Sequence, residues 1–147
     1  MTIDEKPRWL DALERSGLSV LQGPPPEEAP QVSDAIHAVA GWEVQPAAEI
    51  SASDPRAAEE LDEKWHERAR ACSLYDGQGV FLILPPVSGG SRTGWVKVSD
   101  PVGERLPSRI AAATGSPEFI AASLNGCHLC AVSVEDDEYW VVQHDFT

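Results

Sequence analysis

Apolar residues recur at helical spacing over one long segment, residues 54–72. Asp54 is a suitable N-cap and Pro55 suits the first helical position. One face collects the apolar residues Ala58, Leu61, Trp65, Ala69 and Cys72. The opposite face holds acids and bases at pairing distance, Glu60 with Lys64 and Glu67 with Arg70. The pattern predicts an amphipathic helix whose outer face neutralises its own charge.

Two shorter helices are expected nearer the N-terminus. Residues 7–16 place Trp9 and Leu13 on one face, and Gly17 is a suitable stop. Residues 33–40 form a second short apolar segment, capped by Ser33 or Asp34 and closed by Gly41. The proline-rich residues 23–30 between them predict an extended connector.

The period of the pattern changes after Gly77. Val80–Leu84 is a continuous apolar run ended by prolines, which predicts a strand near the centre of a sheet and buried on both faces. Thr93–Val98 predicts a second strand, reached through a flexible connection at 87–92. His128–Val134 and Tyr139–Phe146 predict a closing hairpin.

Two further helices are expected between these pairs of strands. Pro107–Thr114 ends at Gly115, and the cap-like Ser116-Pro117-Glu118 predicts a helix that runs to about Leu124.

Segregated runs of helices and strands favour an α+β fold. We therefore expect a mainly antiparallel sheet of about four strands, packed by helices on one face. Residues 1–30 would form an N-terminal helix and connector, and 31–147 a single globular domain.

The acidic residues that lack basic neighbours are confined to the two ends of the sequence. The 147 residues carry a net charge of −13, and no Lys or Arg lies between Arg15 and Arg56 or after Arg109. Residues 54–109 are nearly neutral, with nine acids and eight bases. A field of one sign repels phosphate backbones and anionic membranes and attracts basic surfaces. We expect a basic protein partner, and neither nucleic-acid nor membrane binding.

Composition gives expectations about the compartment. The longest apolar run is too short to span a membrane, and the acidic N-terminus has no signal-like segment. Three cysteines are an odd number at low density, which favours free thiols in a reducing compartment. We expect a cytoplasmic protein, and the excess of Arg over Lys with abundant Ala hints at a bacterial source.

Cys127 and Cys130 have the spacing of a redox or zinc motif. A redox pair gains its reactivity at a helix N-terminus, whereas this pair follows Gly126 and leads into a predicted strand. Zinc would need two more ligands, recruited by folding from Cys72, His66 or His144. Small buried thiols are the favoured interpretation, and no cofactor or metal is expected.

Other polar groups leave enzymatic chemistry open without defining it. The loop Ser88–Arg92 could hold an anion, but it matches neither a phosphate-binding loop nor a nucleophile elbow. His37 and His144 read as packed histidines on apolar faces. A small enzyme or ligand-binding domain, with a pocket between helix and sheet, would have to use His128, His144 or this loop.

The turn of the terminal hairpin is the candidate binding site. Glu135, Asp136, Asp137 and Glu138 stand together without a basic neighbour, and turn chemistry alone does not require the two glutamates. The segment lacks the spacing of a calcium loop. We predict a protein-interaction module of the inhibitor, immunity-protein or antitoxin type that occludes a basic surface. The acids would steer the partner, and Tyr139, Trp140 or Trp42 would anchor it.

Overall fold

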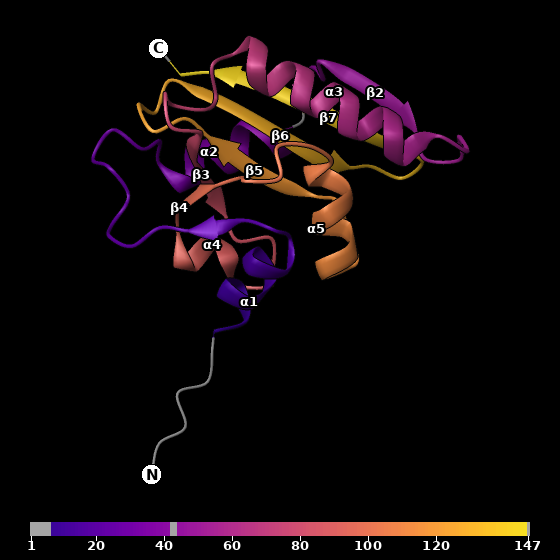
Figure 1. The fold of residues 1–147 in the computed structure, drawn as a ribbon. Helices are drawn as coiled ribbons and strands as arrows, with labels where there is room; N and C mark the ends of the chain where they lie inside the picture. The colour runs from indigo at the N-terminus through magenta and orange to yellow at the C-terminus, as the bar shows by residue number, and fades with distance from the viewer. Residues whose placement is uncertain (1–6, 42–43, 147) are drawn as a thin grey trace.

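The protein is organised around one seven-stranded sheet, seen in a computed structural model that describes residues 7–41 and 44–146 (Figure 1). The strand order is β1-β4-β3-β5-β6-β7-β2, and every neighbouring pair is antiparallel. The strands are β1 (Ser19–Val20), β2 (Ala48–Ser51), β3 (Val80–Leu84), β4 (Val96–Ser99), β5 (Phe119–Ala122), β6 (His128–Val134) and β7 (Glu138–Asp145). The helices are α1 (Arg8–Arg15), α2 (Val32–Ala40), α3 (Ala57–Ala71), α4 (Gly90–Thr93) and α5 (Leu106–Thr114).

The α+β class and the antiparallel sheet are confirmed, but the expectation of about four strands is wrong. The three strands that sequence reasoning missed are β1, β2 and β5, none longer than four residues. Strands this short give too little alternation to be recognised without their partners. β1 pairs with β4 at one edge and β2 pairs with β7 at the other, so both edge strands come from the first 51 residues.

The helix predicted from Ser116 to Leu124 is wrong, because this segment supplies β5. The Ser116 hydroxyl accepts a hydrogen bond from the Glu118 amide at 3.3 Å, so the cap-like residues shape a turn instead. β5 then pairs with β3 on one side and β6 on the other. A four-residue segment gains more from two strand ladders than from a single helical turn.

Helices cover both faces of the sheet, so the expectation of cover on one face is also wrong. Phe81 and Ile83 of β3 pack into a core with residues of α1, α3 and α5. Leu82 and Leu84 point to the other face, into a core that includes Ala35 and Val39 of α2. The burial of β3 on both faces is confirmed, and that burial requires a layer on each side.

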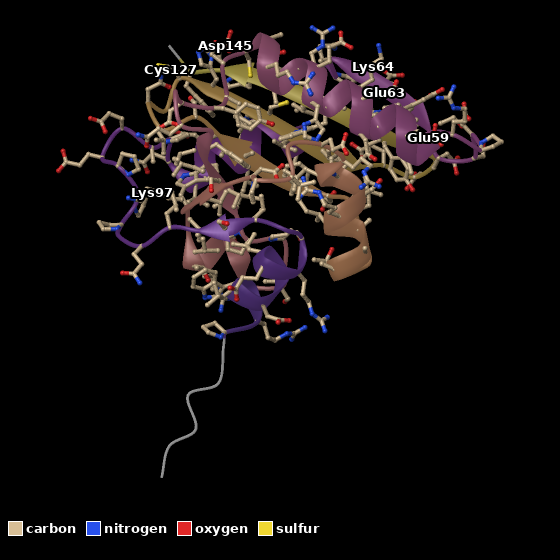
Figure 2. The ribbon with its side chains drawn as sticks, viewed as in Figure 1. Glu59, Glu63, Lys64, Lys97, Cys127 and Asp145 are labelled. Carbon is tan, nitrogen blue, oxygen red and sulfur yellow. The ribbon has the colours of Figure 1, made fainter. Side chains whose placement is uncertain are left out.

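Most of the remaining predicted elements are confirmed, with shifted ends. α3 begins at Ala57 because the Asp54 carboxylate accepts the Arg56 amide in a preceding turn. Ala57 rather than Ala58 is therefore the buried residue of the first turn. The outer face of α3 carries ion pairs between Arg56 and Glu59 and between Lys64 and Glu67, with Glu59, Glu63 and Lys64 directed to solvent (Figure 2). Residues 90–93 form the helical turn α4 where a flexible loop was expected.

Side chains of α3 cap the N-terminus of α5. The Leu106 amide donates to His66 Nε2 at 3.0 Å, and the Ser108 amide donates to Asp62 at 2.9 Å. These two amides belong to the first turn of α5, which has no side-chain cap of its own. Burial lowers the pKa of His66, as its role as a neutral acceptor requires.

Arg109 joins α5 to two neighbouring segments. Its guanidinium donates to the Asp100 carboxylate at 2.7 Å and to the Ser16 carbonyl at 2.6 Å. The Arg109 side chain is 16% exposed and that of Asp100 only 3%. The desolvated ion pair with Asp100 therefore holds the β4–α5 connection to α5, and the hydrogen bond to Ser16 holds the end of α1.

The proline-rich connector packs against the rest of the protein. The Trp95 indole donates to the Pro30 carbonyl at 2.7 Å. Gly126, at φ +74°, lies so close to the Glu28 carbonyl that a Cβ at this position would collide with it. The connector is not extended throughout, because the Ala29 amide donates to the Pro26 carbonyl at 3.1 Å and closes a turn.

Candidate functional site

The predicted hairpin turn joins β6 to β7. The Glu135 amide donates to the Glu138 carbonyl at 2.8 Å, which closes the turn. Asp136 and Asp137 are exposed, and Glu135 and Glu138 are half-buried. The turn thus presents four carboxylates at one end of the sheet.

Two acids that sequence reasoning missed lie beside this turn. Glu49 of β2 stands opposite Trp140 in the register, on the same face as Glu138. Partial burial and the charge of Glu49 raise the pKa of Glu138. The Glu118 carboxylate accepts the Val134 amide at 2.9 Å, where the turn begins. Both acids could have been placed beside the turn from the sequence only if β2 and β5 had been recognised as strands.

We call these six residues the acidic end, defined as Glu49, Glu118, Glu135, Asp136, Asp137 and Glu138. Within residues 7–41 and 44–146, no Lys or Arg forms an ion pair with any of them. Close carboxylates without a counter-charge favour a cation at this surface.

The predicted aromatic anchors do not form one patch. Tyr139 packs on the core shared with α1, α3 and α5, whereas Trp140 packs on the core shared with α2. Adjacent strand residues point to opposite faces, so these two side chains are separated by the sheet. Trp42 lies outside the described residues. Of the described pair, Trp140 shares its face with Glu49 and Glu138.

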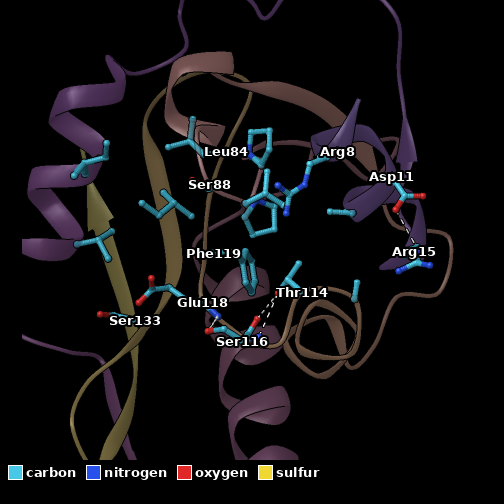
Figure 3. Close-up of a pocket in the computed structure, with 18 of the residues that line it drawn as sticks. Arg8, Asp11, Arg15, Leu84, Ser88, Thr114, Ser116, Glu118, Phe119 and Ser133 are labelled. Carbon is cyan, nitrogen blue, oxygen red and sulfur yellow. Dashed lines mark hydrogen bonds and ion pairs between the residues drawn. The ribbon is translucent and has the colours of Figure 1, made fainter. Parts of the chain in front are cut away.

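A groove of about 760 Å³ opens among α1, α2, the end of β3, the end of α5 and the start of β5 (Figure 3). Its apolar lining includes Val39, Leu84, Pro85, Pro86, Phe119 and Ile120. Arg8 and the Asp11–Arg15 ion pair of α1 contribute charged groups to the lining. The groove combines an apolar surface with a few polar groups, as binding pockets do.

The groove is continuous with the acidic end. Glu118 lines the groove and also binds the amide of Val134, the residue that precedes the acidic turn. Ser133, the next residue back along β6, lines the groove as well (Figure 3). A molecule seated in the groove would therefore contact Glu118, one of the six residues of the acidic end.

The polar part of the groove lining includes several hydroxyl groups. Hydroxyl groups come from Ser88, Thr114, Ser116 and Ser133. The Thr114 hydroxyl donates to a backbone carbonyl, which occupies it structurally. The described lining residues include no histidine or cysteine.

The other candidate groups are dispersed. His128 Nδ1 lies 2.9 Å from an Asp145 carboxylate oxygen, and His66 is occupied in capping α5. The His144 ring packs edge-on against Phe146, and His37 and His144 line a separate groove of about 370 Å³. Ser88 reaches the large groove, but Arg92 does not line it.

The cysteines do not form the motif that their spacing suggested. Cys130 is buried within β6, whereas Cys127 is half-exposed before it, and all three cysteines are free. In the part of the chain that the structure describes, no three His, Cys, Asp or Glu residues are grouped to hold a metal ion.

Comparison with protein-family models, curated proteins and solved structures found no match to this chain. None of the helices within residues 7–41 and 44–146 has both the length and the apolar character needed to cross a bilayer.

Proposed function

We propose that this protein is an interaction module that binds a basic protein and occludes part of its surface, as an inhibitor, immunity protein or antitoxin does. The continuity of the groove with the acidic end, through Glu118, is the observation that supports this proposal. An apolar side chain of the partner would enter the groove, and basic residues beside it would meet the carboxylates.

The two regions would contribute differently to binding. Exposed carboxylates at the acidic end steer a basic partner and accelerate association, an effect of roughly 10- to 1000-fold at low salt. The apolar groove supplies desolvated contact, which slows dissociation. Trp140 and Tyr139 would be secondary contacts, since each is partly committed to a core.

A salt-dependent capture experiment tests the proposal. The immobilised protein is exposed to lysate of its source organism at low and high salt, and retained proteins are identified by mass spectrometry. We expect a basic protein that is retained at low salt and largely released at high salt. Its association rate, measured with both proteins purified, should fall at least about tenfold when the four turn acids become amides.

Matched variants distinguish the effect of the acidic end on association from the effect of the protein's total charge. The test variant carries Glu135→Gln, Asp136→Asn, Asp137→Asn and Glu138→Gln. The control carries Glu59→Gln, Glu60→Gln, Glu63→Gln and Glu67→Gln on α3, which changes the net charge equally. If both sets weaken association to the same extent, the acidic end is not the binding surface.

The groove has its own pair of variants. Ala113 lines it, whereas the neighbouring Ala112 is exposed outside it. Ala113→Trp should fill the groove and accelerate dissociation of the partner, and Ala112→Trp should leave dissociation unchanged. Equal dissociation rates for the two variants would contradict a role for the groove.

Small-molecule binding is the second candidate function. Its support is the groove volume of about 760 Å³, which falls in the range of roughly 300–1,000 Å³ typical of ligand pockets. A ligand screen followed by thermal unfolding tests this alternative. It predicts hits that stabilise the wild type and the Ala112→Trp variant but not Ala113→Trp.

A further inference from the structure

Two buried thiols lie in the same core cluster, where the end of α3 packs on β6. Cys72 follows the last residue of α3, and Cys130 lies in the middle of β6. Cys72 Sγ lies 3.6 Å from the Ala69 carbonyl, and Cys130 Sγ lies 3.9 Å from the Trp65 carbonyl. These two carbonyls lie on successive turns of α3, and both cysteines belong to the same buried core cluster. The fold thus brings together two thiols that are remote in sequence.

The third cysteine stands apart from this pair. Cys127 precedes β6, and its Sγ approaches the Asn125 carbonyl at 3.7 Å. Its surface is partly exposed, whereas Cys72 is 6% exposed and Cys130 fully buried. Figure 2 places Cys127 and Asp145 close to the same end of α3. Cys127 therefore provides an internal reference thiol in a similar region.

The surroundings give the paired thiols unequal reactivity. The interaction with the Cys130 thiol and the charge of His128 lower the pKa of Cys72 to about 7, although burial opposes them. The same interaction and burial raise the pKa of Cys130 well above its usual value. Thiolate is the reactive form of cysteine, so Cys72 is the better nucleophile at neutral pH.

We propose that Cys72 and Cys130 form an oxidisable dithiol, which closes into a disulfide between α3 and β6 when the protein meets a small-molecule disulfide. Both sulfurs lie against carbonyls of successive turns of α3 within one core cluster, and closure must bring them to the S–S bond length of about 2.05 Å. This site is independent of the acidic end and the groove.

The reaction proceeds by two thiol–disulfide exchanges. The Cys72 thiolate attacks one sulfur of oxidised glutathione, forms a mixed disulfide and expels one glutathione thiolate. Cys130 then loses its proton and attacks Cys72 Sγ, which expels the second glutathione. The protein loses two electrons and two thiol protons, and the oxidant becomes two thiols. The charge of Arg68 favours the Cys130 anion in the second step.

Thiol mapping of the folded protein tests the proposal. The reduced full chain is incubated with oxidised glutathione at neutral pH, and the remaining thiols are alkylated before peptide mass spectrometry. We expect a disulfide-linked peptide pair containing Cys72 and Cys130. Excess dithiothreitol should restore both thiols. The oxidised protein should melt at a higher temperature than the reduced one, because the cross-link restricts the unfolded chain.

Single substitutions provide the controls. Cys127→Ser should still form the bridge and show the same rise in melting temperature. Cys72→Ala should form no bridge and show no such rise. The proposal is overturned if Cys72 and Cys130 both remain alkylatable after oxidation, if Cys127 is a partner in the disulfide, or if oxidation stops at a glutathione adduct.

Discussion

Removing the Arg109 guanidinium should destabilise the protein strongly. Arg109→Met keeps much of the side-chain volume but leaves the Asp100 carboxylate, 3% exposed, without its ion-pair partner. The Ser16 carbonyl loses its donor at 2.6 Å, and the Glu104 carbonyl loses hydrogen bonds at 2.8 and 3.0 Å. Breaking a buried ion pair from one side costs about 3–5 kcal/mol.

Urea unfolding measures this loss as a lower midpoint with an unchanged slope. The double variant Arg109→Met with Asp100→Asn should lose less than the sum of the single losses, because no buried charge is stranded. Arg56→Met is the matched control. Its ion pair with Glu59 has a similar length, 3.0 Å, but both side chains are more than half exposed. That change should lower the urea midpoint far less than Arg109→Met does, because solvent screens an exposed ion pair. A loss below about 1 kcal/mol for Arg109→Met, or additive losses in the double variant, would refute the reasoning.

Three further changes test other contacts. The free energy of unfolding should decline as pH falls below about 6.5. In this range His66 of the unfolded chain binds a proton, whereas folded His66 resists protonation because its pKa is lowered. Chemical unfolding across this range should show a shallower decline for His66→Gln. Gly126→Ala should lower the melting temperature more than Gly103→Ala, since both positions have φ near +75° but only Gly126 faces a backbone carbonyl. Trp95→Phe should cost about 1–2 kcal/mol by removing the hydrogen bond to the Pro30 carbonyl, and hydrogen exchange should then quicken in the connector.

Elements defined by their own periodicity could be predicted from the sequence. The α3 stripe of Leu61, Trp65 and Ala69 reaches the core as expected, and the β6–β7 hairpin forms with nearly the expected bounds. β1, β2 and β5 could not be predicted, because their structure depends on distant partners. Ser116 illustrates the difference, since the residue pattern of a helix cap here serves a turn between α5 and β5.

Only the four turn acids of the candidate site could be predicted from the sequence. The four turn acids adjoin one another in sequence, so their clustering was visible before folding. Glu49 and Glu118 join them through strand pairing, and the groove is built from five separate segments. The placement of Cys72 and Cys130 in one core cluster likewise arises from helix–sheet packing. None of these contacts produces a periodic pattern in the sequence from which it could be predicted.

Both edge strands of the sheet, β1 and β2, come early in the sequence, and this constrains when the protein can fold during synthesis. β2 has its sheet partner in β7, the final strand, and β1 waits for β4. The first 51 residues therefore leave the ribosome long before their hydrogen-bonding partners exist. Because long-range pairing delays folding, the sheet can be completed only after β7 has been released. Loss of the last strand would thus leave an N-terminal segment, β2, without a place in the sheet.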